Sequence, residues 1–186
     1  MKELKGFNIV APGSWNKKIF SPQWIVRDVM DGGPEDKIEG VFNSDEMELS
    51  YKIRDMVIAP KDNSLEITSL VNTHDAISSV FSTFMKIISL LPYTPVKGVG
   101  FNFMYAIDSG DVPFLKDQIQ NLDLLPNDLE VLRLSYKKKL DFCTLNIIAE
   151  KRGNNWLITF NFHHPIVAKF DENHLEKLKS HINTYF

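Results

Sequence analysis

The sequence contains a single cysteine, Cys143, in a chain of 186 residues. An internal disulfide bond is therefore impossible, and the apolar run around Cys143 is typical of a buried thiol. This excludes the small secreted proteins that depend on disulfide bonds and favours a reducing compartment. No long apolar stretch follows Met1 to Lys5 to form the core of a secretory signal, so we expect a cytoplasmic protein.

The chain also lacks a long hydrophobic run and a surplus of basic residues. The most apolar helix candidate, Ala76 to Leu91, contains five hydroxyl side chains and Lys86, and falls short of the roughly 20 apolar residues that cross a bilayer. It is typical of a core helix, so we expect no membrane partner. The 21 Lys and Arg residues are outnumbered by 24 Asp and Glu residues, which disfavours a nucleic-acid partner.

Catalytic and metal-binding signatures are absent as well. The sequence has no nucleophile elbow, no phosphate-binding glycine loop, no HExxH helix and no zinc-spaced cysteines. The glycines of Gly98-Val99-Gly100 do not open a predicted helix, which argues against a dinucleotide site. We therefore predict no catalytic residue, no metal ion and no cofactor, and treat enzymatic activity as an alternative only.

The composition is that of an ordinary globular protein. Hydrophobic residues make up 44% of the chain and charged residues 24%. At this length the chain can bury a core of its own without disulfides or a structural metal. We predict a single domain over residues 1–186.

An internal repeat organises the sequence. Four short segments recur in the same order in the two halves, and each recurrence falls on an equivalent predicted element. We interpret the halves, residues 1–92 and 93–186, as divergent copies of one unit. The matches are Gly6-Phe7-Asn8 with Gly100-Phe101-Asn102, Leu49-Ser50-Tyr51-Lys52 with Leu134-Ser135-Tyr136-Lys137, Ile58, Ala59 and Lys61 with Ile148, Ala149 and Lys151, and Asn63 and Leu65 with Asn155 and Leu157.

Hydrophobic periodicity assigns secondary structure to each copy. Apolar residues alternate with other residues from Phe101 to Asp108, which predicts a strand, and its counterpart is Phe7 to Val10. Helices are expected to begin near Ser21-Pro22 and near Asp111 and Pro113. The further predicted strands are Lys37 to Phe42, Met47 to Ala59 and Leu65 to Val71 in copy one, and Leu129 to Leu140, Phe142 to Glu150 and Trp156 to Phe162 in copy two.

Each copy ends with a predicted amphipathic helix, and consecutive strands joined by tight turns are antiparallel. We therefore predict an α+β fold. In it, two tandem β-α-β-β-β-α units form a pseudo-twofold antiparallel sheet, with helices packed on one face and the other face at least partly open. This arrangement resembles the TATA-binding-protein-like saddle and, more loosely, helix-grip folds. No sequence motif of either family occurs, so the resemblance implies an architecture and no function.

The most suggestive cluster of candidate residues is His163-His164-Pro165. Strand alternation places His164 on one face of the sheet and His163 on the other, so the two cannot ligate one metal ion without a bend. His174, near the start of the last helix, is expected to be neutral or at the surface. His74-Asp75 at the start of the first long helix could be an acid and base pair, although the helix dipole already explains an aspartate there.

Two loops of copy one are longer than their counterparts, and an insertion in one copy is not required by the shared fold. They contain Trp15 and Gly32-Gly33. A tryptophan in such a loop either anchors a partner or closes the end of the core, and both interpretations stay open. Lys137 to Lys139 likewise either contacts phosphate or forms a solvated sheet edge.

The main functional hypothesis is a non-catalytic binding or assembly module that recognises a protein partner, or a second copy, through the open sheet face and the copy-one loops. The alternative is a small-molecule receptor or enzyme whose pocket, between sheet and helix, uses His163, His164 or His74. A nucleic-acid saddle is the least favoured. The predicted binding residues are Trp15, Asn102, Thr159, Asn161, His163 and His164.

Overall fold

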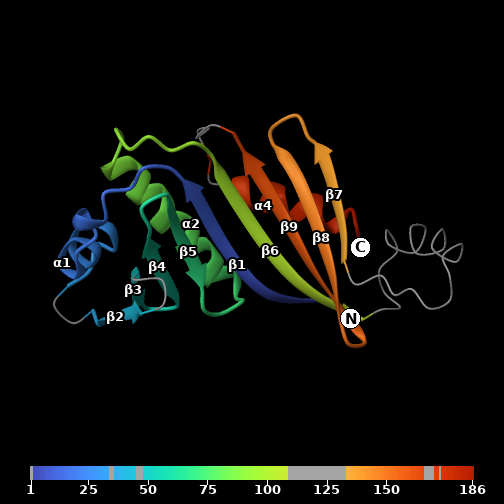
Figure 1. The fold of residues 1–186 in the computed structure, drawn as a ribbon, viewed down its shortest axis with the longest axis horizontal. Helices are drawn as coiled ribbons and strands as arrows, with labels where there is room; N and C mark the ends of the chain where they lie inside the picture. The colour runs from blue at the N-terminus through green and yellow to red at the C-terminus, as the bar shows by residue number, and fades with distance from the viewer. Residues whose placement is uncertain (1, 34–35, 45–47, 109–132, 166–169, 172) are drawn as a thin grey trace, which may run out of the picture.

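The structure is a computed structural model that describes residues 2–33, 36–44, 48–108, 133–165, 170–171 and 173–186. It is an α+β protein in which one large antiparallel sheet of nine strands packs against helices, three of them in the described chain (Figure 1). The strands are β1 (Lys2–Pro12), β2 (Ile38–Asn43), β3 (Glu48–Ile53), β4 (Met56–Pro60), β5 (Ser64–Ser69), β6 (Val99–Asp108), β7 (Arg133–Lys139), β8 (Thr144–Arg152) and β9 (Asn155–His164). The α-helices are α1 (Pro22–Trp24), α2 (His74–Leu90) and α4 (His174–Asn183), and the chain also forms the 3-10 turn η1 (Lys17–Ile19) and the π-helical turn η2 (Ile25–Val29).

Alternation along the strands gives the sheet one apolar face. In β6 and β9, Phe103 lies opposite Phe160, and Phe101 lies opposite Phe162. All four side chains are fully buried, whereas Asn102 between them is only half-buried on the other face. Each buried phenylalanine contributes about 1.5–3 kcal/mol to folding, so the apolar face fixes the register of the central strands.

The strand order is β2-β3-β4-β5-β1-β6-β9-β8-β7. The first half of the chain supplies one end of the sheet and the second half the other, and β1 and β6 pair where the halves meet. Outward from this junction, β5, β4 and β3 follow β1, just as β9, β8 and β7 follow β6. The described part of the second half contains no strand in the position of β2.

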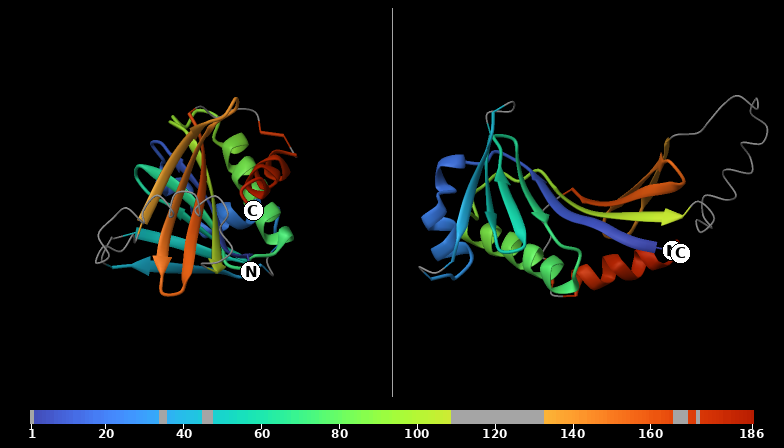
Figure 2. Two further views of the ribbon diagram at one scale, coloured as in Figure 1. Left: turned by 90° about the vertical axis from the view of Figure 1, so that its right-hand side faces the viewer. Right: turned by 90° about the horizontal axis from the view of Figure 1, so that it is seen from below.

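The two long helices cover the apolar face. The hydroxyl of Thr73 caps α2 by accepting a hydrogen bond from Ala76 N at 3.3 Å. Phe84 of α2 packs edge-on against Phe101 of β6, and Leu178 of α4 is fully buried. Figure 2 shows α2 and α4 on the same side of the sheet. No described helix lies over the opposite side.

The first helical segment begins where the sequence predicts. The Ser21 hydroxyl caps it by accepting from Trp24 N at 3.2 Å, and Pro22 occupies the first turn. The α-helical turn continues directly into the π-helical turn η2, whose end lies beside α2. Lys86 of α2 contacts Asp31 there, with an Nζ to Oδ1 distance of 3.2 Å.

One predicted strand of copy one is wrong in its extent. The segment expected to run unbroken to Ala59 consists of the two strands β3 and β4, joined by a tight turn at Arg54. Arg54 has a φ of 49°, a conformation that a glycine or asparagine would signal but an arginine does not. The first half therefore has five strands rather than four. The predicted starts at Met47, Asp111 to Pro113 and Leu129 lie outside the described residues.

Two of the four sequence matches occupy corresponding places in the sheet. Asn8 of β1 and Asn102 of β6 pair with each other in the middle of the sheet. Tyr51 of β3 and Tyr136 of β7 both point towards the helices from the equivalent strands. These matches, GFN and LSYK, are aligned as the sequence suggested.

In the other two matches, the residues that correspond in the sheet differ by one position from those that correspond in the sequence. Ile58 pairs with the first of these tyrosines, whereas Ile147 rather than Ile148 pairs with the second. Leu65 is buried beneath the helices, whereas Leu157 is half-exposed on the opposite face. A shift of one residue moves a side chain to the other face of a sheet, and local identity alone could not detect it.

Candidate functional site

We call the side of the sheet opposite α2 and α4 the open face. Its central side chains are half-buried, because neighbouring strands shield them but no described helix does. They mix amides and hydroxyls with aliphatic groups. The central residues of the open face are Glu66 and Thr68 of β5, Asn8 and Val10 of β1, Asn102 and Met104 of β6, Leu157, Thr159, Asn161 and His163 of β9, and Thr144, Asn146 and Ile148 of β8.

A chain of hydrogen-bonded side chains crosses five strands of this face, and we call it the amide ladder. Asn146 Nδ2 donates to Asn161 Oδ1 at 2.9 Å, and Asn161 Nδ2 donates to Asn102 Oδ1 at 2.6 Å. Asn102 Nδ2 donates in turn to Asn8 Oδ1 at 2.7 Å. Asn8 Nδ2 donates to Glu66 Oε1 at 2.9 Å, where the ladder ends.

All hydrogen bonds of the ladder are donated in the same direction, towards Glu66, and the carboxylate of Glu66 explains this direction. An ionised carboxylate accepts hydrogen bonds and donates none, so Asn8 must turn its NH2 group towards Glu66. The Asn8 oxygen then faces Asn102, and every later amide follows the same orientation. Hydrogen bonds aligned in this way polarise one another, and the one to the carboxylate is charge-assisted.

The ladder leaves hydrogen-bonding capacity on the open face. A primary amide has two N–H donors and two lone pairs, and each of the three interior asparagines uses one of each within the ladder. Among the described residues, one donor and one acceptor per amide have no further partner, and this pattern repeats at the strand spacing of about 4.8 Å. Such a row of amides can recognise polar groups through hydrogen bonds.

Glycines make room for this surface. A Cβ atom on Gly100 would lie 2.9 Å from Nδ2 of Asn161, and one on Gly6 would lie 2.5 Å from Cε of Met104. Both distances are shorter than carbon atoms tolerate. The glycine of each GFN segment therefore leaves space for the side chain that crosses it on the open face.

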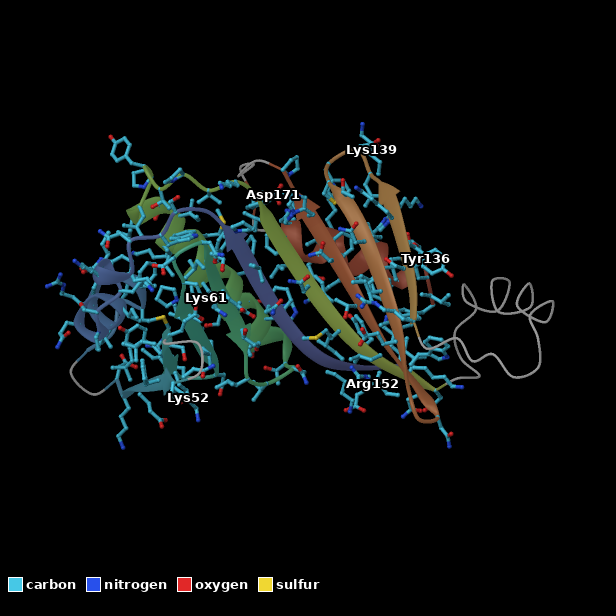
Figure 3. All side chains as sticks on the ribbon, in the orientation of Figure 1. Lys52, Lys61, Tyr136, Lys139, Arg152 and Asp171 are labelled. Carbon is cyan, nitrogen blue, oxygen red and sulfur yellow. The ribbon has the colours of Figure 1, made fainter. Side chains whose placement is uncertain are left out.

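A pocket of about 230 Å³ adjoins the Glu66 end of the ladder. Glu66 and Thr68 line one side of it, and Lys61 and Glu48 form an ion pair at 3.0 Å on another. The half-buried charges give this end of the open face a polar recess. Figure 3 shows Lys61 and Lys52 towards this end of the molecule.

The three lysines of β7, at the other end, do not form one cluster. Strand alternation places Lys137 and Lys139 on the side of the open face, opposite Asn146 and Thr144. Figure 3 labels Lys139 at the end of β7. Lys138 points the other way, with Nζ 5.9 Å from the centre of the Tyr185 ring. The run is thus divided between the two faces of an edge strand.

The structure places His163 and His164 on opposite faces, as the alternation predicts. His163 is half-buried on the open face, whereas His164 is 2% exposed under the helices. Nε2 of His164 lies 3.3 Å from Nε2 of His174, and the rings of Phe101 and Phe170 enclose the pair. His174 is therefore buried, so of the two positions expected from the sequence, a neutral imidazole or a surface residue, it does not occupy the second.

The surroundings keep this histidine pair uncharged at neutral pH. Burial, together with the nearby His174, lowers the pKa of His164 to about 4. Burial also lowers the pKa of His174, which the charge of Asp171 partly offsets. With both rings neutral, one Nε2–H donates to the lone pair of the other Nε2. The pair links β9 to the start of α4.

His74, the third histidine of the alternative hypothesis, lies elsewhere. Its imidazole is exposed at the start of α2, where Nδ1 is 2.9 Å from Nζ of Lys179 and 3.7 Å from Glu176. The structure thus brings His164 together with His174, but it brings neither His163 nor His74 to that pair. No pocket combines the three histidines of the alternative hypothesis within the described residues.

Trp15 closes the end of the core. Its side chain is 4% exposed, and Nε1 donates to the carbonyl oxygen of Ala11 at 2.8 Å. The ring packs edge-on against Phe20, with 6.2 Å between the ring centres. Of the two interpretations that the sequence leaves open, this placement corresponds to the structural one.

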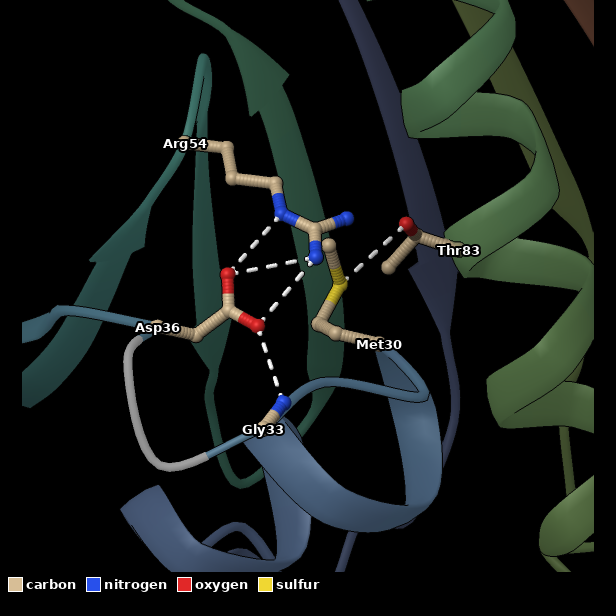
Figure 4. A network of polar contacts seen from close by, with 5 residues as sticks. All are labelled: Met30, Gly33, Asp36, Arg54 and Thr83. Atoms are coloured by element: carbon tan, nitrogen blue, oxygen red, sulfur yellow. Dashed lines mark hydrogen bonds and ion pairs between the residues drawn. The ribbon is translucent and has the colours of Figure 1, made fainter.

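Hydrogen bonds and an ion pair of Asp36 fix the second copy-one loop, which contains Gly32-Gly33. The Asp36 carboxylate accepts from Gly33 N at 3.2 Å and from the Arg54 guanidinium at 3.2–3.4 Å (Figure 4). This contact joins the loop to the turn between β3 and β4. A pocket of about 510 Å³ lies beside it, lined by Pro22, Gln23, Val26, Arg27, Gly32, Gly33, Asp36 and Ile38.

Other classes of site find no support in the part of the chain that the structure describes. There, no three His, Cys, Asp or Glu side chains gather as ligands for a metal ion. Among the described helices, none has the length and apolar character to cross a membrane. The chain matches no protein-family model and no curated protein.

Sequence reasoning named two of the five ladder residues, Asn102 and Asn161. Asn102, Thr159, Asn161 and His163 lie on the open face, as the alternation of β6 and β9 predicts. The sequence interpretation missed the other ladder residues. One signal in the sequence could have found Asn8, because the GFN repeat makes it the counterpart of Asn102. The missed residues are Asn8, Glu66 and Asn146.

Proposed function

We propose that the protein is a non-catalytic binding or assembly module that recognises a protein partner through the open face. The amide ladder, from Asn146 to Glu66, carries the proposal. Asparagine is depleted in β-strands, where β-branched and aromatic residues pack better. Four asparagines aligned across the middle of a sheet therefore favour recognition over stability as the reason for their presence.

The spare donors and acceptors of the ladder suit the peptide groups and polar side chains of a protein. Aliphatic side chains, such as Val10, Met104 and Ile148, lie beside the amides on the same face. A mixture of apolar area with regularly placed hydrogen bonds is the usual composition of a protein interface. The charged pocket between Glu66 and Lys61 adds a polar recess for a side chain of the partner.

The copy-one loop around Gly32-Gly33 is the second contact region of the proposal. Its support is the adjoining pocket of about 510 Å³, which the ion pair of Asp36 with Arg54 keeps in shape. Trp15 is not part of the proposed contact, because its side chain lies in the core.

We also propose that residues 1–92 and 93–186 are duplicated units that form a pseudo-twofold saddle. The pairing of β1 with β6 supports this proposal. Its register is symmetric about the two GFN segments, so each segment pairs with equivalent positions of the opposite strand. Asn8 pairs with Asn102, and the pair of Gly6 with Met104 mirrors that of Gly100 with Val10. On this proposal, the pseudo-twofold axis passes between the two central asparagines of the ladder.

A cytoplasmic location completes the proposal. The only cysteine, Cys143, is buried, and burial raises the pKa of its thiol to about 11. A thiol in this state is unreactive, and no disulfide constrains the fold. This suits a reducing compartment.

Affinity capture with three matched baits tests the proposed site. The wild type, Thr159→Arg on the open face and Ser89→Arg on α2 are immobilised and exposed to an extract of cells that express the protein. Both substitutions add one arginine at an accessible position, but on opposite sides of the sheet. We expect a protein that binds the wild type and Ser89→Arg but not Thr159→Arg. Identical capture by all three baits, or no specific capture by the wild type, would contradict the proposal.

A further inference from the structure

The two edges of the sheet differ in charge. The β7 edge carries Arg133 and the lysines at positions 137–139 in a seven-residue strand. Rows of basic side chains discourage a sheet edge from pairing with another strand. The β2 edge, from Ile38 to Asn43, has one charged side chain, Glu39. Only the β7 edge therefore has a row of charges against pairing.

The β2 edge also exposes apolar side chains. Phe42 is 59% exposed and Val41 is 45% exposed, and Leu49 on β3, opposite Phe42, is 42% exposed. Cδ1 of Leu49 lies 3.6 Å from the position that a Cβ on Gly40 would take, so this leucine leans over the glycine towards the edge. Phe42 and Leu49 lie on one face of the sheet and Val41 on the other. Among the described strands, β2 pairs on one side only, and exposed apolar side chains on such an edge strand are typical of a site of β-augmentation.

We propose that β2 pairs with β2 of a second copy of this chain, antiparallel and centred on Gly40, so that the two nine-stranded sheets become continuous. In this register Ile38 lies opposite Phe42 of the second copy, on the same face as Leu49. Glu39 lies opposite Val41 of the second copy, so no two carboxylates face each other. The edge is thus complementary to itself.

The charges argue against other occupants. A strongly basic or acidic strand would find a single carboxylate on the edge, and Glu39 already lies opposite Lys52 of β3. Pairing β2 with β7 of another copy would place the basic strand against an apolar one and would leave both outer edges free to continue into a fibre. A twofold contact between β2 strands closes on itself. This inference does not rest on the open face and goes beyond the proposed function.

Sedimentation velocity of the full chain over a range of micromolar concentrations tests the dimer. A contact of one strand with a small apolar cluster is at the low end of interface sizes, so we expect a dissociation constant on the order of 10 μM. The mass should rise from 21.4 kDa towards twice this value. Phe42→Lys places a charge in the pairing edge and should weaken the dimer at least about tenfold. Ser135→Lys, an exposed position on β7, is the matched control and should dimerise like the wild type.

A cysteine trap tests the register. With Cys143→Ala to remove the native thiol, Gly40→Cys should form an intermolecular disulfide, because directly opposite residues have Cα atoms about 4.5–5.5 Å apart. The new side chain fits, since its Cβ meets Leu49 at an ordinary contact distance of 3.6 Å. The control Ser135→Cys, in the same Cys143→Ala background, should form no intermolecular disulfide under the same oxidation.

Three outcomes would overturn the proposal. They are a wild type that stays monomeric at all concentrations, a dimer that Phe42→Lys leaves unchanged, and a disulfide that forms at position 135 but not at position 40. Phe42 is mostly exposed, so the charged variant should keep the circular dichroism spectrum and melting temperature of a wild-type monomer. None of these results bears on partner capture by the open face, so the two proposals can fail separately.

Discussion

Acidification should destabilise the protein through the buried pair of His164 and His174. The pKa of His164 is about 4 in the folded chain, against 6.5 for an unperturbed histidine. The unfolded chain therefore binds the proton first as the pH falls. Stability from the neutral imidazole is fully present above pH 6.5 and is lost between pH 6.5 and 4.

The folded and unfolded pKa values of His164 determine how much unfolding free energy is lost. Their difference corresponds to about 3 kcal/mol of unfolding free energy once the pH is below 4, and about 2 kcal/mol of this is already lost at pH 5. His174 adds to the loss, because burial lowers its pKa as well. The charge of Lys177 lowers both pKa values, so it also favours the neutral pair.

Urea unfolding at several pH values from 8 to 5 measures this loss. In His164→Phe the ring remains aromatic but cannot titrate, so the fall in unfolding free energy between pH 7 and 5 should shrink by about 2 kcal/mol. The absolute stability of this variant is not the readout, because it leaves His174 without its partner. His74→Gln removes an exposed imidazole that lies apart from the pair and is the matched control. Equal pH dependence in the wild type and His164→Phe would refute the reasoning.

Three further substitutions separate structural from functional roles. Trp15→Ala removes a buried ring and its hydrogen bond, and should lower the free energy of unfolding by about 3–5 kcal/mol in urea titrations; a loss below 1 kcal/mol would mean that Trp15 is not a core residue. Asn102→Leu cuts the amide ladder at a half-exposed position, so it should change stability by no more than about 1 kcal/mol while abolishing partner capture. Gly153→Ala forces a side chain onto a residue with a φ of 59° in the β8–β9 turn, and should lower the melting temperature by the equivalent of about 1 kcal/mol.

The parts of the fold that follow from local sequence were predicted well. The alternation of apolar and other residues predicted β6 and β9 and the face of the sheet on which each side chain lies. This worked because the alternation depends only on neighbouring residues in the sequence. The caps at Ser21 and Thr73 were visible because a hydroxyl precedes each apolar stripe. The turn at Arg54 was missed, because its positive φ is imposed by β3 and β4 pairing with each other and not by the residue type.

The candidate site was harder to predict because its contacts are long-range. The hydrogen bond between Asn8 and Asn102 joins residues 94 positions apart, and it exists only because β1 and β6 pair in one register. His174 approaches His164 only once α4 is packed on the sheet. Neither contact has a spacing that a sequence pattern could show.

The central claim is that the open face is the partner-binding surface, and oxidation footprinting of the captured complex tests it most directly. Met104 lies on the open face and Met85 on α2, and both side chains are half-buried, so they report on opposite sides of the sheet with similar initial accessibility. The account predicts that partner binding slows hydrogen-peroxide oxidation of Met104 several-fold and leaves that of Met85 unchanged. Protection of Met85 with unaltered oxidation of Met104 would contradict it.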